Sequence, residues 1–179
     1  MTKDGLRKII KEKEKSLSFS YKKEASEAIT KHILTNSDFI NAKSVFIYMS
    51  LPGEPSTDKL IEASFRMNKA VYVPYCIKKG QMKAVRIYPD SVLYDGYMGI
   101  KEPEITNSEC ADDFDIAIIP CVSASDDGRR LGHGGGFYDI FLKGKKAKTY
   151  CLCFKKLMNN EIPTEEHDVC VFSVVTEKT

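Results

Sequence analysis

A glycine-rich stretch in the last third of the chain holds the residues best suited to chemistry. Residues 129–146, RRLGHGGGFYDIFLKGKK, place four glycines within five positions. Glycine permits unusual backbone dihedral angles and lets backbone N–H groups approach an anion closely. Cations stand beside the glycines at Arg129, Arg130 and Lys143, and a carboxylate follows at Asp139. Cations can neutralise a polyphosphate and a carboxylate can hold Mg²⁺, so this stretch predicts a phosphate-binding loop.

Two plainer interpretations of the stretch stay open at the level of sequence. A cluster of glycines also forms tight surface turns, and the charges beside it also suit a solvated face. The stretch lacks the lysine and hydroxyl residue that close a P-loop. Its glycine spacing also differs from the dinucleotide-binding fingerprint of a first βα unit. The motif therefore belongs to neither of these two nucleotide-binding classes.

Length and composition indicate one domain over residues 1–179, in the class of soluble globular proteins. Hydrophobic residues make up 42% of the chain and charged residues 29%. A net charge of +2 gives no broad field for nucleic acid. We find no secretory signal and no apolar run long enough for a membrane, so we expect a cytoplasmic protein. The six cysteines lack C-x-x-C spacing, which favours reduced and mostly buried thiols.

Hydrophobic patterning predicts an α/β fold, an open and mostly parallel sheet flanked by helices on both faces. Strand 44–50, helix 56–68 and strand 70–75 follow one another as a βαβ unit, which implies parallel strands and a right-handed crossover. Residues 94–113 are polar and rich in turns, so they are expected to wrap the surface and can line a cleft. The other expected elements are helices over 4–17 and 21–35 and strands over 83–89, 115–122, 148–154 and 172–176.

The order of elements places the glycines where α/β proteins bind ligands. Strand 115–122 is followed by the loop 123–130, the glycine segment 131–136, and a short helical pattern from residue 137. Ligands in open α/β sheets settle beyond the carboxyl ends of the strands. The glycine segment is therefore expected at the mouth of a binding site.

RLGHGGGFYDIFL resembles the signature of the 5-formyltetrahydrofolate cyclo-ligase family, also called 5,10-methenyltetrahydrofolate synthetases. That signature reads Arg-Leu-Gly-Arg-Gly-x-Gly-Tyr-Tyr-Asp and then an apolar pair. Further segments resemble the family in the same order along the chain: KDGLRK, YMSLPGEPST, YMGIKEPE and IPTEEHDV. The resemblance covers nearly the whole chain, and it implies a scaffold similar to sugar-phosphate isomerases and CoA-transferases.

The resemblance implies a reaction that uses ATP and Mg²⁺ to convert 5-formyltetrahydrofolate to 5,10-methenyltetrahydrofolate, with release of ADP and phosphate. The formyl oxygen is a poor leaving group. Its attack on the γ-phosphorus of ATP would give an imidate phosphate, to which N10 adds as phosphate departs. Transfer of this kind depends on alignment and on charge stabilisation at the phosphoryl oxygens.

The resemblance also implies roles for particular residues. Arg130 and Tyr138 are expected to be catalytic, and Asp139 and Asp168 to bind Mg²⁺. Residues expected to bind ATP are Lys3, Arg7, Arg130, Leu131, Gly132, His133, Gly134, Gly135, Gly136, Phe137 and Tyr138. Residues expected to bind the folate are Met49, Glu54, His133, Gly134, Gly135, Gly136 and Phe137.

Several of these residues also suit a structural role without ligand binding. Lys3 and Arg7, at i and i+4 on one helix face, also suit an ordinary basic surface. Asp168 also suits a loop cap, and Glu54 a charge at the start of a helix. The basic run 143–148 could attract the tail of a polyglutamylated folate or be merely solvated.

Two departures from the family pattern bear on activity. His133 stands where the family has arginine, and Phe137 replaces the first tyrosine. Two rival functions follow: a sugar-phosphate isomerase-like or acyl-transferase-like enzyme, and a non-enzymatic protein that holds folate or nucleotide. We favour the cyclo-ligase, acting as a monomer with a folate and ATP as partners and with neither nucleic acid nor membrane.

Overall fold

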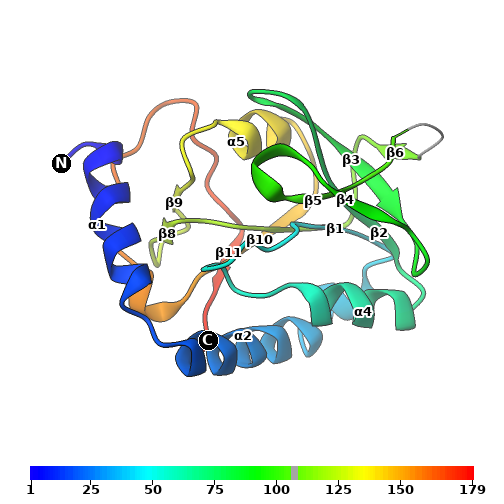
Figure 1. Ribbon diagram of the computed structural model, residues 1–179, viewed down its shortest axis with the longest axis horizontal. Coiled ribbons are helices and arrows are strands. Elements are labelled where there is room, and N and C mark those ends of the chain that lie inside the picture. The colour runs from blue at the N-terminus through cyan, green and yellow to red at the C-terminus, as the bar shows by residue number, and fades with distance from the viewer. Residues whose placement is uncertain (106–108) are drawn as a thin grey trace.

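A mostly parallel sheet forms the centre of the protein (Figure 1). The structure is a computed structural model that describes residues 1–105 and 109–179. Within these residues, seven strands pair in the order β11-β10-β7-β1-β2-β3-β6. Neighbouring strands from β11 to β2 are parallel, whereas β3 and β6 run antiparallel to their neighbours. The strands are β1 (Ser44–Ile47), β2 (Ala70–Lys78), β3 (Gln81–Ile87), β6 (Cys110–Ala111), β7 (Ile116–Ile119), β10 (Lys148–Leu152) and β11 (Ser173–Val175).

The predicted α/β class and the predicted strands are confirmed, with shifted boundaries. The central strands are apolar on both faces, as strands buried between two layers of helices must be. Strand β2 extends to Lys78 and β3 already begins at Gln81, so only residues 79 and 80 connect them. Gly80 has φ of +77°, which an L side chain rarely adopts, and it lets the chain reverse there.

Helices cover both faces of the sheet. In β1, Phe46 packs against Phe141 with ring centroids 4.9 Å apart. Its neighbours Val45 and Ile47 are buried on the opposite face because successive strand residues alternate. Figure 1 shows α2 and α4 together along the lower side of the sheet and α5 on its upper side. The helices are α1 (Lys3–Lys15), α2 (Phe19–Leu34), α3 (Ser37–Asn41), α4 (Asp58–Arg66) and α5 (Phe137–Leu142).

Hydroxyl side chains begin two of these helices. Thr2 accepts a hydrogen bond from Gly5 N at the start of α1, and Ser18 accepts one from Tyr21 N at the start of α2. The hydroxyl before α4 does not cap its helix: Thr57 Oγ1 donates to Tyr48 O at 2.7 Å. Thr57 therefore joins the end of β1 to the start of α4 instead of satisfying the helix N–H groups.

Short elements surround the carboxyl ends of β1 and β7. The predicted turn-rich segment 94–113 contains part of β4 (Leu93–Asp95), then the 3₁₀ turn η1 (Tyr97–Gly99), β5 (Lys101–Pro103) and β6; its residues 106–108 lie outside the described residues. Strands β8 (Ser123–Ala124) and β9 (Arg130–Leu131) form a hairpin before the glycine segment, and η2 (Lys155–Leu157) follows β10.

The burial of the cysteines differs in part from the expectation of mostly buried thiols. All six cysteines are free, as predicted, but they are not mostly buried. Cys121, Cys151 and Cys153 are buried, Cys76 is half-buried, and Cys110 and Cys170 are exposed. Cys110 and Cys170 lie in short edge or loop segments, where little chain is available to cover them.

Within the described residues, no helix combines the length and the apolar character that crossing a membrane requires.

Candidate active site

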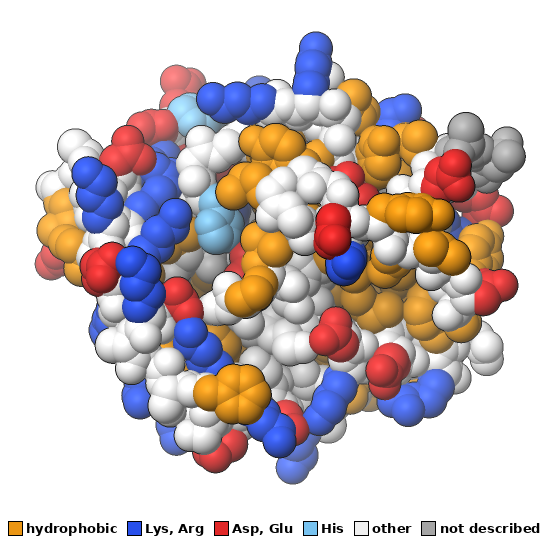
Figure 2. Space-filling model, viewed as in Figure 1, with side chains coloured by type: hydrophobic (Ala, Val, Ile, Leu, Met, Phe, Trp, Pro, Cys, Tyr) orange, Lys and Arg blue, Asp and Glu red, His pale blue; other side chains and the backbone are white. Residues whose placement is uncertain are grey.

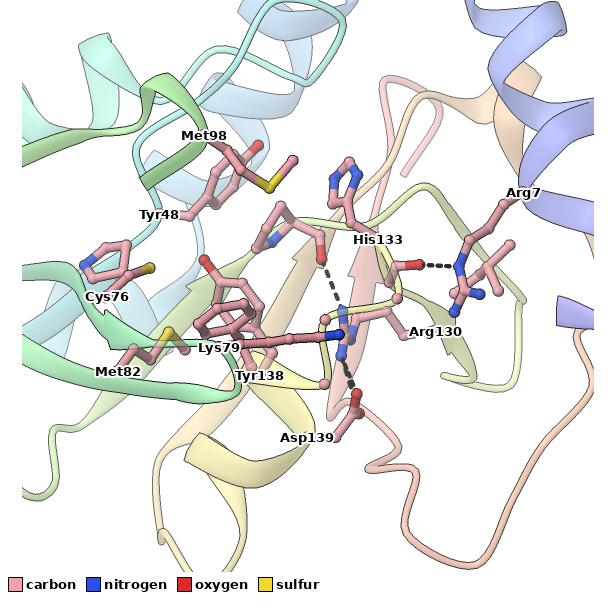
Figure 3. A pocket seen from close by; sticks show the side chains of 18 of the residues that line it. Arg7, Tyr48, Cys76, Lys79, Met82, Met98, Arg130, His133, Tyr138 and Asp139 are labelled. Atoms are coloured by element: carbon pink, nitrogen blue, oxygen red, sulfur yellow. Dashed lines mark hydrogen bonds and ion pairs between the residues drawn. The ribbon is translucent and has the colours of Figure 1, made fainter. Parts of the chain in front are cut away.

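A cavity of about 650 Å³ opens where β1 and β7 end (Figure 3). Every residue assigned a role by the family resemblance lines it. These residues are Lys3, Arg7, Met49, Glu54, Arg130, Leu131, Gly132, His133, Gly134, Gly135, Gly136, Phe137, Tyr138, Asp139 and Asp168. They come from segments far apart in the chain, so the fold brings the predicted set together. Their individual roles remain predictions.

Arg130 is the most enclosed cation of the cavity. Its side chain is 4% exposed, and its Nη2 donates to both oxygens of Asp139 at 3.0 Å. The guanidinium also lies 5.6 Å from the ring centroid of Tyr138. Within the described residues, Arg130 Nε is buried and has no hydrogen-bond partner. An unsatisfied buried donor is costly, which indicates that a ligand atom is meant to lie near it.

The glycines let the backbone pass close to the side chains beside it, including Arg130. A Cβ atom on Gly132 would lie 2.8 Å from Arg130 Nη1, and one on Gly135 would lie 2.7 Å from the Phe137 ring. Gly134 and Gly136 have φ of +97° and +67°, where an L side chain is strained. Any side chain would therefore displace a functional group or distort the loop.

Helix α1 carries two cations, Lys3 and Arg7, that lie on the same side of the cavity. Arg7 Nε donates to Gly132 O at 2.7 Å, and Arg7 Nη1 lies 2.5 Å from Asp4 Oδ1. Lys3, one turn earlier, donates to both oxygens of Asp168 at 2.7 and 2.6 Å. The predicted common face of Lys3 and Arg7 is thus present, and it faces the cavity rather than bulk solvent.

The two carboxylates predicted to bind Mg²⁺, Asp139 and Asp168, lie on neighbouring parts of the cavity wall. Asp139 Oδ1 accepts from Val169 N at 3.3 Å, so it lies next to the loop that carries Asp168. Burial alone would raise the pKa of Asp168, but the hydrogen bonds from Lys3 and from Glu165 N lower it more, and the pKa lies below its ordinary value. Ligand atoms of Glu165, His167 and Asp168 lie within 4.8 Å of one another. Oxygen and imidazole ligands thus gather beside the glycine segment.

His133 contacts the other predicted binding residue, Glu54. His133 Nε2 lies 2.9 Å from Glu54 Oε1, and Glu54 Oε2 accepts from Leu51 N at 2.8 Å. The Glu54 side chain is 9% exposed, whereas that of His133 is 41% exposed. The residue that departs from the arginine of the family pattern therefore faces a carboxylate of the cavity.

The far side of the cavity is apolar. Tyr48, Cys76, Met82 and Met98 line it together with Tyr138 (Figure 3). Burial and the neighbouring Glu102 raise the pKa of Cys76 to about 12. Burial, and then the charge of Glu54, raise the pKa of the Tyr138 hydroxyl. Both groups are therefore protonated near neutral pH.

Exposed apolar side chains continue this wall onto the surface. Figure 2 shows them gathered over the upper right half of the face in view, where β4 and β5 lie in Figure 1. Val92, Tyr94, Tyr97 and Met98 are exposed there, and Tyr97 packs on Phe137 with ring centroids 5.4 Å apart. The apolar side of the cavity is thus continuous with this patch.

Two cations predicted to neutralise phosphate are placed elsewhere. Arg129 pairs with Asp127 and donates to Ile162 O and Asn160 O, and Lys143 is exposed; neither belongs to the described residues that line the cavity. Arg129 and Arg130 are adjacent in an extended segment, so their side chains point in opposite directions. Only Arg130 can then face the cavity.

Sequence reasoning missed a further group of lining residues: Thr2, Asp4, Tyr48, Leu51, Pro74, Cys76, Lys79, Met82, Tyr97, Met98, Ile100, Pro120, Glu165 and His167. Several of them lie within or beside the segments that resembled the family, so proximity to those segments was an available signal. Cys76, Lys79 and Met82 come from the β2–β3 hairpin, for which the sequence offered no motif.

Comparisons with known proteins bear on the family of the chain. The model of the 5-formyltetrahydrofolate cyclo-ligase family matches residues 1–177. The chain is 32% identical over 159 residues to a 5-formyltetrahydrofolate cyclo-ligase of Haemophilus influenzae, covering 85% of each chain. It is 26% identical to a mouse enzyme of that name, covering 98% of this chain and 93% of the mouse protein. A solved structure, the 5,10-methenyltetrahydrofolate synthetase of Aquifex aeolicus, has 27% identity and a TM-score of 0.87, covering 100% of this chain and 91% of its own.

Proposed function

The chain belongs to the 5-formyltetrahydrofolate cyclo-ligase family, and from this premise we propose that it closes 5-formyltetrahydrofolate to 5,10-methenyltetrahydrofolate with ATP and Mg²⁺. The observation that carries the proposal is the buried Arg130 Nε, which has no partner among residues 1–105 and 109–179, beside glycines that leave room for a ligand. A phosphate oxygen is the acceptor that suits a guanidinium and nearby backbone N–H groups. The other groups of the cavity fit the same substrates.

The side of the cavity that carries Arg130, Arg7 and the glycine segment is suited to the nucleotide. ATP supplies the phosphoryl group that turns the formyl oxygen into a leaving group. Arg130 and Arg7 hold charge beside the glycine backbone, where the phosphoryl oxygens must be stabilised. Tyr138, packed against Arg130 and protonated, orients the guanidinium and borders the reacting centre. Alignment, rather than a strong base, is the contribution expected of these residues.

Mg²⁺ fits the two carboxylates. In the part of the chain that the structure describes, four Lys or Arg side chains and five Asp or Glu side chains line the cavity. A polyphosphate would enter a site without positive surplus, so a divalent cation is needed to complete the charge balance. Asp139 and Asp168 are the residues that would hold it, and Mg²⁺ would neutralise charge on the phosphate oxygens. Lys3 and Arg130 hold the two carboxylates in place through ion pairs.

The apolar side of the cavity is suited to the folate. Glu54 offers a carboxylate that can accept hydrogen bonds from pterin N–H groups, and it is held by Leu51 N and His133. Met49 and Phe137 supply apolar surface for a flat ring. In this proposal the folate lies next to Tyr138, at the border with the phosphate side.

The cavity argues against acyl transfer through a thiol and against a purely binding role. Cys76 is the thiol that lines it among the described residues, and its pKa of about 12 makes it a poor nucleophile for acyl transfer. A non-enzymatic binding protein would not need Arg130, Asp139 and Asp168 arranged beside the glycine segment. The departures at His133 and Phe137 leave those three residues unchanged.

One assay tests the proposal. Purified protein with 5-formyltetrahydrofolate, ATP and Mg²⁺ should develop methenyl absorbance, which should require all three components. Arg130→Met should abolish the activity, whereas Lys143→Met, a matched change outside the cavity, should preserve it. Folded native protein at high concentration that produces no methenyl absorbance would refute the proposed function.

We further infer that the protein acts as a monomer in the cytoplasm. Six free cysteines, two of them exposed, suit a reducing compartment. One chain supplies all the residues assigned to the site, so catalysis needs no second copy. Cell fractionation and light scattering of the purified protein test these two points.

A further inference from the structure

Lys79 is a cavity-lining cation that no sequence motif identified. It lies in the turn between β2 and β3, and its side chain is exposed to the cavity. Within the described residues it has no ion pair or hydrogen bond through its ammonium group. In Figure 3 the side chain points into the cavity, toward the side where Arg130 and Asp139 lie. A cation in this position is available to a ligand.

The other cations of the cavity are already paired with carboxylates. Lys3 pairs with Asp168, Arg7 with Asp4 and Arg130 with Asp139. Each of these pairs reduces, without removing, the charge that its cation offers to a further anion. Among the described Lys and Arg side chains that line the cavity, Lys79 is the one that keeps its full charge for a ligand.

The turn that carries Lys79 is fixed to the glycine segment. Gly80 is buried, and a Cβ atom there would lie 3.4 Å from Ile140 Cδ1 and 3.8 Å from Gly135 O. The backbone of the turn thus packs on α5 and on the predicted phosphate loop. The position of Lys79 relative to the glycines is set by the fold, and only its side chain needs to be ordered by a ligand.

The same hairpin also builds the apolar wall. Cys76 and Met82 line the side of the cavity assigned to the folate, on the two strands that flank Lys79. Arg7 and the glycines lie on the other side. Lys79 therefore approaches bound nucleotide from the folate side, where the terminal phosphate must point for transfer to the formyl oxygen.

We propose that Lys79 binds the terminal phosphoryl group of the nucleotide and distinguishes ATP from ADP. This inference rests on the proposed function. An ammonium group can follow the phosphoryl group as it moves toward the acceptor, because its three donors rotate on a flexible stem. The inner phosphates are left to Arg130, Arg7 and the glycine backbone.

Calorimetric titration with two nucleotides tests the inference, each in the presence of Mg²⁺. Lys79→Ala should weaken binding of a non-hydrolysable ATP analogue about tenfold, the loss of one charge-assisted hydrogen bond, and should change ADP binding less than about twofold. Lys79→Arg should restore most of the affinity for the analogue. Lys78→Ala is the matched control, because Lys78 is exposed and lies outside the described lining. It should change neither affinity.

Three results would contradict the inference. Equal weakening of both nucleotides by Lys79→Ala would mean that Lys79 acts on the inner phosphates. Unchanged binding of both would mean that its ammonium stays in solvent. If the native protein binds neither nucleotide, the proposed function itself is wrong and the assignment of Lys79 falls with it. If the native protein binds both nucleotides, the third result is excluded, and the Lys79→Ala variant then decides between the first two.

Discussion

The ion pair of Arg130 and Asp139 should contribute to stability as well as to catalysis. The side chains are 4% and 18% exposed, and Arg130 Nη2 contacts both carboxylate oxygens. Asp139→Asn removes the negative charge but keeps one oxygen as an acceptor. The enclosed guanidinium is then left without its counter-charge. We therefore expect a loss of folding free energy in addition to the loss of the proposed metal ligand.

The structure sets the size of this loss. Removing one partner of a buried pair typically costs about 3–5 kcal/mol. The remaining acceptor and the partial exposure of residue 139 reduce the figure, and we expect about 2 kcal/mol. For a chain of this size the melting temperature should fall by about 4–8 °C.

Thermal unfolding followed by circular dichroism measures this change. Arg130→Met and the double variant complete a cycle, in which the double variant should lose about 1.5 kcal/mol less than the sum of the single changes. Glu12→Gln is the control, because its pair with Lys15 is exposed, and it should leave the melting temperature unchanged. Additive losses in the cycle, or a melting temperature of Asp139→Asn equal to the native value, would refute the reasoning.

Three further predictions concern other parts of the site. Gly135→Ala should lower kcat/KM for ATP at least about tenfold, because its Cβ would lie 2.7 Å from the following phenylalanine ring. Gly144→Ala, with φ of +79° and open space around it, should cost about 1 kcal/mol of stability and leave that kinetic constant intact. Cys76, with its pKa of about 12, should resist alkylation at pH 8 while the two exposed cysteines react, as peptide mass spectrometry would show. Lys3→Gln should melt below the native protein at pH 6 but match it near pH 2, because Lys3 lowers the pKa of Asp168 and that stabilisation is lost as pH falls through the lowered value; a constant difference across this range would contradict it.

The sequence predicted the fold because its local patterns agree with the tertiary structure. Strand 44–50 and helix 56–68 were recognisable from β-branched runs and from helical spacing, and both exist with shorter boundaries. The antiparallel return of β3 was not predicted. It follows from the two-residue turn at residues 79 and 80, which is too short for the crossover that a parallel strand needs.

The site was predictable where residues belong to a motif and unpredictable where folding alone brings them in. All residues assigned by resemblance reach the cavity, from Lys3 to Asp168. Lys79 and Met82 reach it only because β3 returns beside β2, a relation between strands that no local pattern of residues encodes. Arg129 was misplaced for a related reason, since adjacency in sequence does not say which of two neighbours faces inward.

The contact of Lys3 with Asp168 links positions 165 residues apart and therefore determines when the site can form during synthesis. A chain emerging from the ribosome exposes Lys3 long before it releases Asp168, which follows 165 residues later. The central strands β1 and β2 can pair much earlier, because both precede the middle of the sequence. The nascent protein should thus acquire a sheet well before it can hold a nucleotide, and incomplete chains should lack the complete site.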